Sequence, residues 1–345
     1  MTEIKRIAID TSKSVFTLHG VDDAGRAVLR RNLRRGELLR YFEKLPAVEV
    51  ALEACGGSHH WGRALSAFGH QVRLIPPQYV KPFVKRSKND RNDAEAIAVA
   101  AAQPSIGSVP IKAVEQQAAA MLLSVRELLV RQRTQLVNAM RGHAAEMGVV
   151  APLGEKGCKE LQAEIATADE VAVPAAAKQA IALLGREVER IEVRLRAIEA
   201  TLMQQHKANP LSRRLSRRLA AIPGIGPIGA LNLALRVEAR QFASARHFAA
   251  WLGLVPRECS TAGRQRLGGI SRAGDERLRQ LLVLGATAVI QHAKPGRPAT
   301  SQWLLNLLNR KPRKLAAVAL ANKMARIVWA MMTSGKTYRP APAAD

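Results

Sequence analysis

The first hundred residues alternate between short apolar runs and amphipathic stretches. Short apolar or alternating runs predict strands, whereas apolar residues spaced three and four apart predict helices. The predicted strands are 6–10, 15–20, 27–33, 48–53 and 71–75, and the predicted helices are 37–45, 60–68 and 90–102. Three strands joined by hairpins, followed by alternating helices and strands, predict an α/β domain with a mixed sheet.

This order of elements matches the ribonuclease-H-like plan, in which acidic residues end two neighbouring central strands. Asp10 ends the first predicted strand, Glu53 ends the fourth, and Asp90 and Asp93 lie one turn apart at the start of the last helix. Acids on such apolar strands are costly unless something positive neutralises them. We therefore predict that the four carboxylates hold Mg²⁺ or Mn²⁺.

A simpler interpretation exists for the two helical acids alone. Asp90 can cap free amides at a helix start, and Asp93 can complement the helix dipole. Only their combination with Asp10 and Glu53 favours the metal site.

Residues 114–147 predict a long helix in which arginines alternate with apolar residues. A solvated helix face is the default explanation, but a face that binds phosphates is an equal alternative beside an acidic site. The residues predicted to contact nucleic acid are Arg126, Arg133 and Arg141 on this helix, and Lys88 and Arg91 beside the two helical acids.

A linker with a short helix is predicted over 151–174, followed by a strict heptad pattern. Apolar residues recur three and four apart from Ile181 to Leu202, with charged residues between them. Such a narrow seam is typical of a coiled coil. We expect its partner to be a second copy of the chain, giving a homo-oligomer, either a dimer or a tetramer.

The C-terminal part is predicted to be mostly helical. Ile222–Gly226 resembles the turn of a helix-hairpin-helix module, in which Gly224 and Gly226 let backbone amides approach a phosphate. A tight turn between two packed helices would use the same residues. A polar loop is predicted over 254–263, helices continue to about 334, and the tail 338–345 is predicted to be disordered.

Charge and composition indicate a polyanionic partner. The 345 residues contain 53 Lys and Arg against 28 Asp and Glu, a formal charge of +25, and between 211 and 345 the ratio is 23 to 5. Three separated cysteines give no disulfide or zinc pattern and fit a reducing cytoplasm. The apolar stretch 315–332 is interrupted by Lys323 and Arg326, so no membrane span is expected.

Six short segments in this order resemble the DEDD-type transposases of bacterial insertion sequences, the one-ten family with its eleven-eleven branch, which is related to pilin-gene invertases. The segments are 9–13, 52–56, 88–94, 222–227, 253–257 and 268–274. The resemblance implies a ribonuclease-H-like (RuvC-like) domain, a coiled coil and a C-terminal transposase domain. It also implies oligomers guided to donor and target DNA by an element-encoded RNA, acting in the bacterial cytoplasm at the nucleoid.

The family's acids fall on Asp10, Glu53, Asp90 and Asp93, and its nucleophilic serine falls on Ser260. Many relatives read Ser-Ser-Gly-Gly where this chain has residues 260–263, so Thr261 stays open as the alternative nucleophile. The loop shows no obvious general base. The basic residues expected to hold nucleic acid around it are Arg257, Arg264, Arg266 and Arg272.

The resemblance implies an RNA-guided recombinase that joins DNA through a phosphoserine, and the acidic residues and the positive charge are compatible with it. The rival is a metal-dependent nuclease of the Holliday-junction-resolving type, and a silent nucleic-acid-binding protein would not need four converging acids. A nuclease would leave the C-terminal domain without a task. The predicted domains are 1–148 (catalytic, with the long basic helix), 149–208 (linker and coiled coil) and 209–337 (transposase domain).

Overall fold

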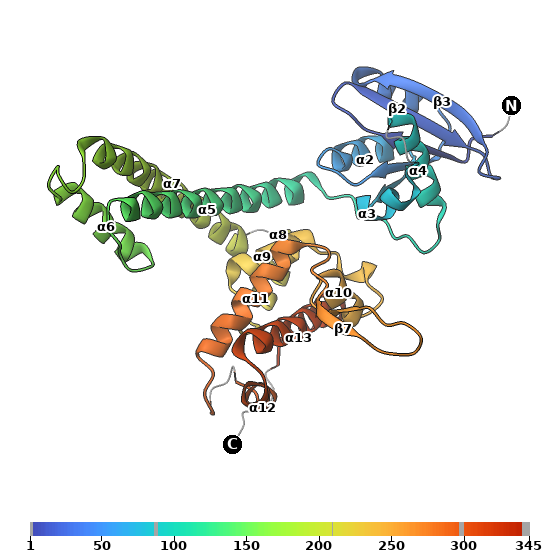
Figure 1. The fold of residues 1–345 in the computed structure, drawn as a ribbon. Helices are drawn as coiled ribbons and strands as arrows, with labels where there is room; N and C mark the ends of the chain where they lie inside the picture. The colour runs from blue at the N-terminus through green and yellow to red at the C-terminus, as the bar shows by residue number, and fades with distance from the viewer. Residues whose placement is uncertain (1–2, 86–88, 209, 297–299, 340–345) are drawn as a thin grey trace. The chain divides into compact units, whose positions relative to one another are not determined.

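The computed structural model describes residues 3–85, 89–208, 210–296 and 300–339. The chain folds into two compact units, Met1–Gln116 (unit 1) and Gln117–Asp345 (unit 2). Figure 1 shows the sheet of unit 1 and the helices of unit 2. Each unit is described by itself.

Unit 1 is built on a five-stranded mixed sheet in the order β3-β2-β1-β4-β5. Strands β1 (Arg6–Asp10), β2 (Val15–Val21) and β3 (Ala27–Arg34) are antiparallel neighbours. Strands β4 (Glu49–Glu53) and β5 (Gln71–Ile75) continue the sheet in parallel from β1. All five predicted strands are therefore confirmed, and Asp10 and Glu53 end neighbouring strands.

Helices cover both faces of this sheet because alternate strand residues point to opposite sides. Ile9 and Leu18 pack with Trp61 and Leu65 of α2 (Ser58–Ala67), and α1 (Leu38–Glu43) joins that core. On the other face, Ala8 packs with small residues of α4 (Asp90–Ala102). The short elements η1 (Arg35–Glu37), α3 (Pro77–Val80) and η2 (Lys81–Phe83) complete the unit. This mixed architecture agrees with a DEDD-type, ribonuclease-H-like domain.

Unit 2 is mostly helical, as predicted. The long α5 (Val114–Glu146) enters it from the end of unit 1 and is followed by α6 (Glu155–Thr167) and α7 (Ala175–Ala208). The remaining elements are α8 (Pro210–Leu219), α9 (Pro227–Arg236), η3 (Ala239–Gln241), α10 (Ala245–Trp251), β6 (Pro256–Glu258), β7 (Leu267–Ile270), α11 (Glu276–Gln291), α12 (Gln302–Arg310) and α13 (Arg313–Ser334).

The heptad seam of α7 packs inside its own chain. Ile191 and Leu195 are buried against Leu129 of α5, and Figure 1 shows the two helices side by side. Ile181 packs with α6 at one end of the seam, and Leu202 packs with α5 and α9 at the other. The expectation that a second copy of the chain covers this seam is wrong, because a heptad pattern specifies a helical partner without saying which chain supplies it.

The C-terminal core is formed by α8 to α13. Among the described residues, α13 is the one helix long and apolar enough to cross a bilayer, but Ala321, Met324 and Val328 are buried in this core. The segment between Pro256 and Ile270 is a β-hairpin and not the predicted loop. Its polar, glycine-rich composition hid two short exposed strands.

The four-part domain division stays a prediction, although contacts within the chain group the long helix α5 with unit 2 rather than with residues 1–116. The six last residues of the predicted tail lie outside the described part of the chain.

Candidate functional site

Three of the four predicted acids meet at the end of the unit 1 sheet. One carboxylate oxygen from each of Asp10, Asp90 and Asp93 lies within 4.8 Å of the other two. Asn89 caps the helix by accepting a hydrogen bond from the Asn92 amide, so Asp90 does not have to serve as the cap. The two helical acids are thus available to the site. The capping role expected for Asp90 is wrong, but both acids still lie in the first turn of α4, where they complement the helix dipole.

The charge of this cluster is not balanced by its own side chains. Burial, together with the negative charges of Asp93, Asp90 and Glu53, raises the pKa of Asp10 from 3.8 to about 6. A divalent cation among these oxygens would cancel the repulsion between the carboxylates, since carboxylate oxygens are the ligands that Mg²⁺ prefers. The residues present therefore fit a divalent metal site.

Glu53 stands slightly apart from the other three acids. It follows Leu52, whose partner on β1 is Ile9, so it ends the strand next to Asp10. Its charge acts on Asp10, but its carboxylate is not among the three that converge within 4.8 Å. Its place as a fourth ligand stays a prediction.

The basic residues predicted along the helices have different surroundings. Arg126 forms an ion pair with Glu199 of α7, 2.6 Å from nitrogen to oxygen, and Arg141 donates to the carbonyls of Ala151 and Pro152. Both contacts hold unit 2 together and explain these arginines without nucleic acid. For Arg133, which is half-buried, phosphate binding stays a prediction.

Near the acid cluster, Arg91 is exposed on the first turn of α4. Lys88 lies outside the described residues.

The glycines of the predicted helix-hairpin-helix turn have unequal roles. Gly224 has φ +85°, and a Cβ there would lie 2.6 Å from the carbonyl oxygen of Gly285 on α11. Close packing of two backbones therefore requires this glycine, which favours the tight-turn explanation. Gly226 caps α9 in open space, and its contact with a phosphate stays a prediction.

Ser260 lies on the β6–β7 hairpin, whose residues from Pro256 to Gly269 are all exposed. The tip is a two-residue turn in which Ala262 and Gly263 both have positive φ, as a type I′ turn requires. Arg257, Arg264, Arg266 and Arg272 all have exposed side chains on or beside this hairpin. The strands therefore present Ser260 to solvent among positive charges.

The Ser260 hydroxyl has two hydrogen-bond partners. It donates to Oε1 of Glu258 at 2.9 Å and accepts from the Arg266 amide at 3.1 Å. Residues two apart on a strand share a face, so the hairpin itself brings Glu258 beside Ser260. The sequence indicated no obvious general base in this segment, whereas the structure places a carboxylate beside the serine: treating the segment as a loop concealed the i, i+2 relationship.

The base of the hairpin is fixed by a close backbone contact. Gly274 has φ +65°, and a Cβ there would lie 1.8 Å from the carbonyl oxygen of Trp251. Arg279, nearly buried, donates to the carbonyls of Leu252 and Ala273 on the two sides of this contact. The exposed hairpin is therefore joined to the core through a closely packed base.

Two family models match the chain. Residues 7–148 match a transposase model of the DEDD type, and residues 216–301 match the model described as "Transposase IS116/IS110/IS902 family". The first match contains the acid cluster, and the second contains the serine hairpin.

Full-length relatives extend this similarity over nearly the whole chain. The transposase for insertion sequence element IS1111A of Coxiella burnetii is 38% identical over 98% of this chain and 92% of its own length. The transposase for IS1328 of Yersinia enterocolitica is 36% identical over 98% of this chain and 99% of its own length. A putative transposase of Sinorhizobium fredii is 51% identical over 98% of this chain and 87% of its own length.

Proposed function

Because the chain belongs to the IS116/IS110/IS902 family of transposases, enzymes that recombine DNA, we propose that it moves its insertion sequence by RNA-guided strand exchange through a phosphoserine intermediate. The observation that carries the proposal is the convergence of Asp10, Asp90 and Asp93. Such a site has no use in a protein that only binds nucleic acid.

The acid cluster of unit 1 is proposed to bind Mg²⁺ or Mn²⁺. When bound, the metal supplies positive charge to the scissile phosphate. Asp10, Asp90 and Asp93 supply the ligand oxygens, and Glu53 completes the set from the neighbouring strand. The protein's part is to place these acids on two strand ends and one helix turn, which orients the phosphate before reaction.

Ser260 is proposed as the nucleophile. Its Oγ attacks the phosphorus while its proton passes to Glu258, and the bond from phosphorus to the leaving sugar oxygen breaks as that oxygen takes up a proton. A serine hydroxyl is a weak nucleophile alone, so a carboxylate 2.9 Å away supports this role. Rejoining reverses the step: a sugar hydroxyl attacks the phosphoserine and Ser260 regains its proton. Ser260 is favoured over Thr261 because it has the carboxylate partner.

The two catalytic elements belong to different units. The mechanism requires a serine hairpin, from the same subunit or from another, to reach the phosphate held at an acid cluster. Donor and target DNA are the proposed substrates, and a homo-oligomer, dimer or tetramer, would bring several hairpins and clusters to them. The α7 seam does not contribute to such an assembly, because it is covered within the chain.

RNA guidance is the part of the proposal that rests most on the family resemblance. The net charge of +25 and the positive C-terminal half are compatible with binding an RNA together with DNA. The protein acts in this proposal in the bacterial cytoplasm, where it meets the nucleoid.

The proposal is tested with purified protein, its copurifying RNA and DNA carrying the element's ends. A covalent protein-DNA adduct on a denaturing gel, lost in Ser260→Ala and in Asp90→Asn, is the expected result. Nicked DNA without an adduct would favour the junction-resolving nuclease. Nuclease-treated protein should lose sequence-specific recombination and regain it with the cognate RNA, and full specific activity without RNA would refute guidance.

A further inference from the structure

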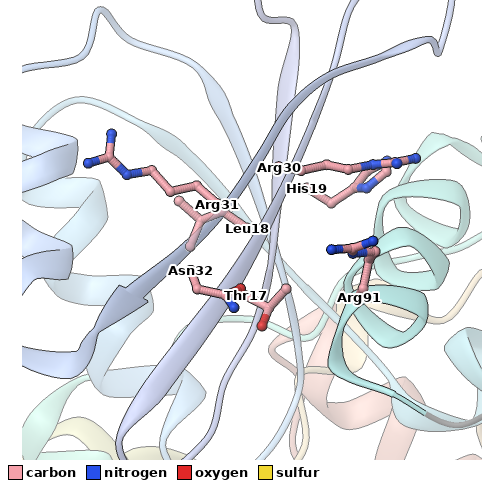
Figure 2. Close-up of a pocket in the computed structure, with 7 residues that line it drawn as sticks. All are labelled: Thr17, Leu18, His19, Arg30, Arg31, Asn32 and Arg91. Atoms are coloured by element: carbon pink, nitrogen blue, oxygen red, sulfur yellow. The ribbon is translucent and has the colours of Figure 1, made fainter.

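A basic pocket lies on unit 1 between the β2–β3 hairpin and the first turn of α4. It has a volume of about 150 Å³ and is lined by Thr17, Leu18, His19, Arg30, Arg31, Asn32 and Arg91. Figure 2 shows Arg30, His19 and Arg91 gathered on one side of the hairpin, with Thr17 and Asn32 below them. The name hairpin pocket is used for the five residues drawn on this side: Thr17, His19, Arg30, Asn32 and Arg91.

Strand register explains why these residues share a face. On the two strands His19 is paired with Arg30 and Thr17 with Asn32, so all four side chains point to the same side of the sheet. The residues between them, Leu18 and Arg31, point to the opposite side. Leu18 lies in the core there, and the Arg31 guanidinium lies 5.0 Å from the ring centre of Tyr41. Figure 2 shows Arg31 directed away from the pocket.

The pocket is rich in hydrogen-bond donors, and the negative charge of Glu95 acts on its Arg30 and His19. Neither Arg30 nor Arg91 has an ion pair with any residue that the structure describes. The nearby Glu95 already binds Lys85 at 2.8 Å. Two guanidinium groups beside an amide and a hydroxyl suit an anion with several acceptor oxygens.

His19 supplies a second, independent observation. Its side chain is only 4% exposed, yet its Nδ1 has no hydrogen-bond partner within the described parts of the chain. Buried polar atoms in folded proteins are nearly always paired, and an exception needs an explanation. A ligand oxygen in the pocket would provide the missing partner once the enclosed Nδ1 is uncovered by a shift of the His19 ring.

The hairpin pocket is next to the acid cluster. Asp10 is paired with Thr17 across β1 and β2, and Thr17 is paired with Asn32 across β2 and β3. Neighbouring strands lie about 4.8 Å apart, so the pocket begins one strand from Asp10. Arg91 also follows Asp90 directly on α4.

We propose that the hairpin pocket binds a backbone phosphate of the DNA strand being cut, next to the phosphate held at the acid cluster. The inference rests on the proposed function of that cluster. A DNA strand presents a row of phosphates, and a second fixed phosphate would set its direction and register across the acids. RNA carries the same group, but the strand that reaches the acid cluster is the substrate of cleavage.

The first test is binding of a fluorescently labelled DNA duplex by full-length protein in the Asp10→Asn background, measured by anisotropy over a series of KCl concentrations. Arg30→Gln should reduce the slope of log affinity against log salt by about 0.9, the value for one phosphate contact. The matched control is Arg31→Gln, which removes the same charge from the opposite face of the same strand and should leave the slope unchanged. Arg30 and Arg31 are both exposed, so both variants should fold.

Equal slopes in the two variants would overturn the proposal. So would a reduced slope for labelled RNA with none for DNA, which would assign the pocket to RNA. Because this measurement needs no cleavage, it can fail while the proposed catalytic function holds, and the reverse is equally true.

The second test concerns position. Once the cut is mapped, one neutral methylphosphonate is placed beside the scissile phosphate. This change should lower the cleavage rate of wild type and of Arg31→Gln several-fold. The cleavage rate of Arg30→Gln should be the same with and without the methylphosphonate. The same loss in all three proteins would refute contact between the pocket and that phosphate.

Discussion

The hydroxyl of Ser260 donates to the carboxylate of Glu258 across 2.9 Å, and Glu258 is the last residue of β6, two residues earlier on the same side of an exposed hairpin. A general base typically contributes a factor of about 10² to 10⁴. Glu258→Gln should therefore slow formation of the covalent DNA adduct by about 100-fold or more while DNA affinity stays within a factor of a few. The measurement is a time course on denaturing gels.

Controls separate this role from a change of charge. Glu276→Gln, at an exposed acid outside the hairpin, should keep the wild-type rate. Ser260→Ala should give no adduct, and Thr261→Ala should still give one. If the adduct survives in Ser260→Ala and disappears in Thr261→Ala, the nucleophile is Thr261 and Glu258 is not its base.

Asp10 gives a prediction about pH and metal. Its pKa in the folded protein is about 6, above the ordinary value of 3.8, so the folded state holds this proton more tightly than the unfolded state. Its contribution to stability is therefore greatest at low pH and is lost as pH rises from about 4 to about 6. Metal competes with that proton, so affinity for Mg²⁺ should increase over the same interval.

Asp10→Asn removes the repulsion. Without metal at about pH 8, the variant should be more stable than wild type by about 1–2 kcal/mol after allowance for solvent screening, and near pH 4 the difference should vanish. Urea unfolding with EDTA measures both. Asp23→Asn, at an acid whose side chain is 83% exposed and pairs with Lys5, is the control and should show no such stabilisation at about pH 8. If Asp10→Asn is less stable than wild type at both pH values, the claim that the neighbouring acids repel the Asp10 carboxylate is wrong.

Because the α7 seam is covered by α5 of the same chain, a charge placed in the seam should lower the stability of unit 2 and leave the mass of the oligomer unchanged. Ile191 is 6% exposed against α5, whereas Val193, two residues away, is 58% exposed. Ile191→Glu buries a charge and should destabilise unit 2 by about 3 kcal/mol or more, whereas Val193→Glu should change stability by less than about 0.5 kcal/mol. Urea unfolding measures the difference. If Ile191→Glu instead keeps its stability and halves the mass in light scattering, the seam joins subunits after all.

The sequence was sufficient for the parts of the fold that repeat a local pattern. Alternation predicted all five strands of unit 1, and the helical start at Asp90 placed two acids on one turn. The order of elements then brought Asp10 to the same place, because α4 packs on the face of the sheet to which Ala8 and Asp10 of β1 both point.

The sequence did not show which segment or residue packs against a given pattern. Heptads in α7 did not specify that α5 of the same chain covers them. The hairpin pocket was missed because Arg30 and His19 are opposite one another only once β2 and β3 have a register. Glu258 was missed for a similar reason, since a segment of polar residues and glycines was taken for a loop, although the i, i+2 spacing would have been a signal.

The last prediction concerns the turn that holds the serine hairpin together. Ala262 has φ +48° and Gly263 has φ +75°, and an alanine in this left-handed region costs about 1–2 kcal/mol relative to glycine. Ala262→Gly should therefore stabilise the hairpin, by about 0.5–1 kcal/mol once the larger freedom of glycine in the unfolded chain is subtracted. Gly263→Ala is the matched opposite, because a Cβ at that position meets nothing within 4 Å and only the backbone is strained. Hydrogen exchange at the amides of Cys259, Arg264 and Arg266, which close the hairpin through hydrogen bonds, reads this local stability directly. Protection should rise in Ala262→Gly and fall in Gly263→Ala. Because Arg266 N–H also positions the Ser260 hydroxyl, adduct formation should change in the same order, and opposite orders in the two measurements would show that a rigid hairpin is not what the reaction needs.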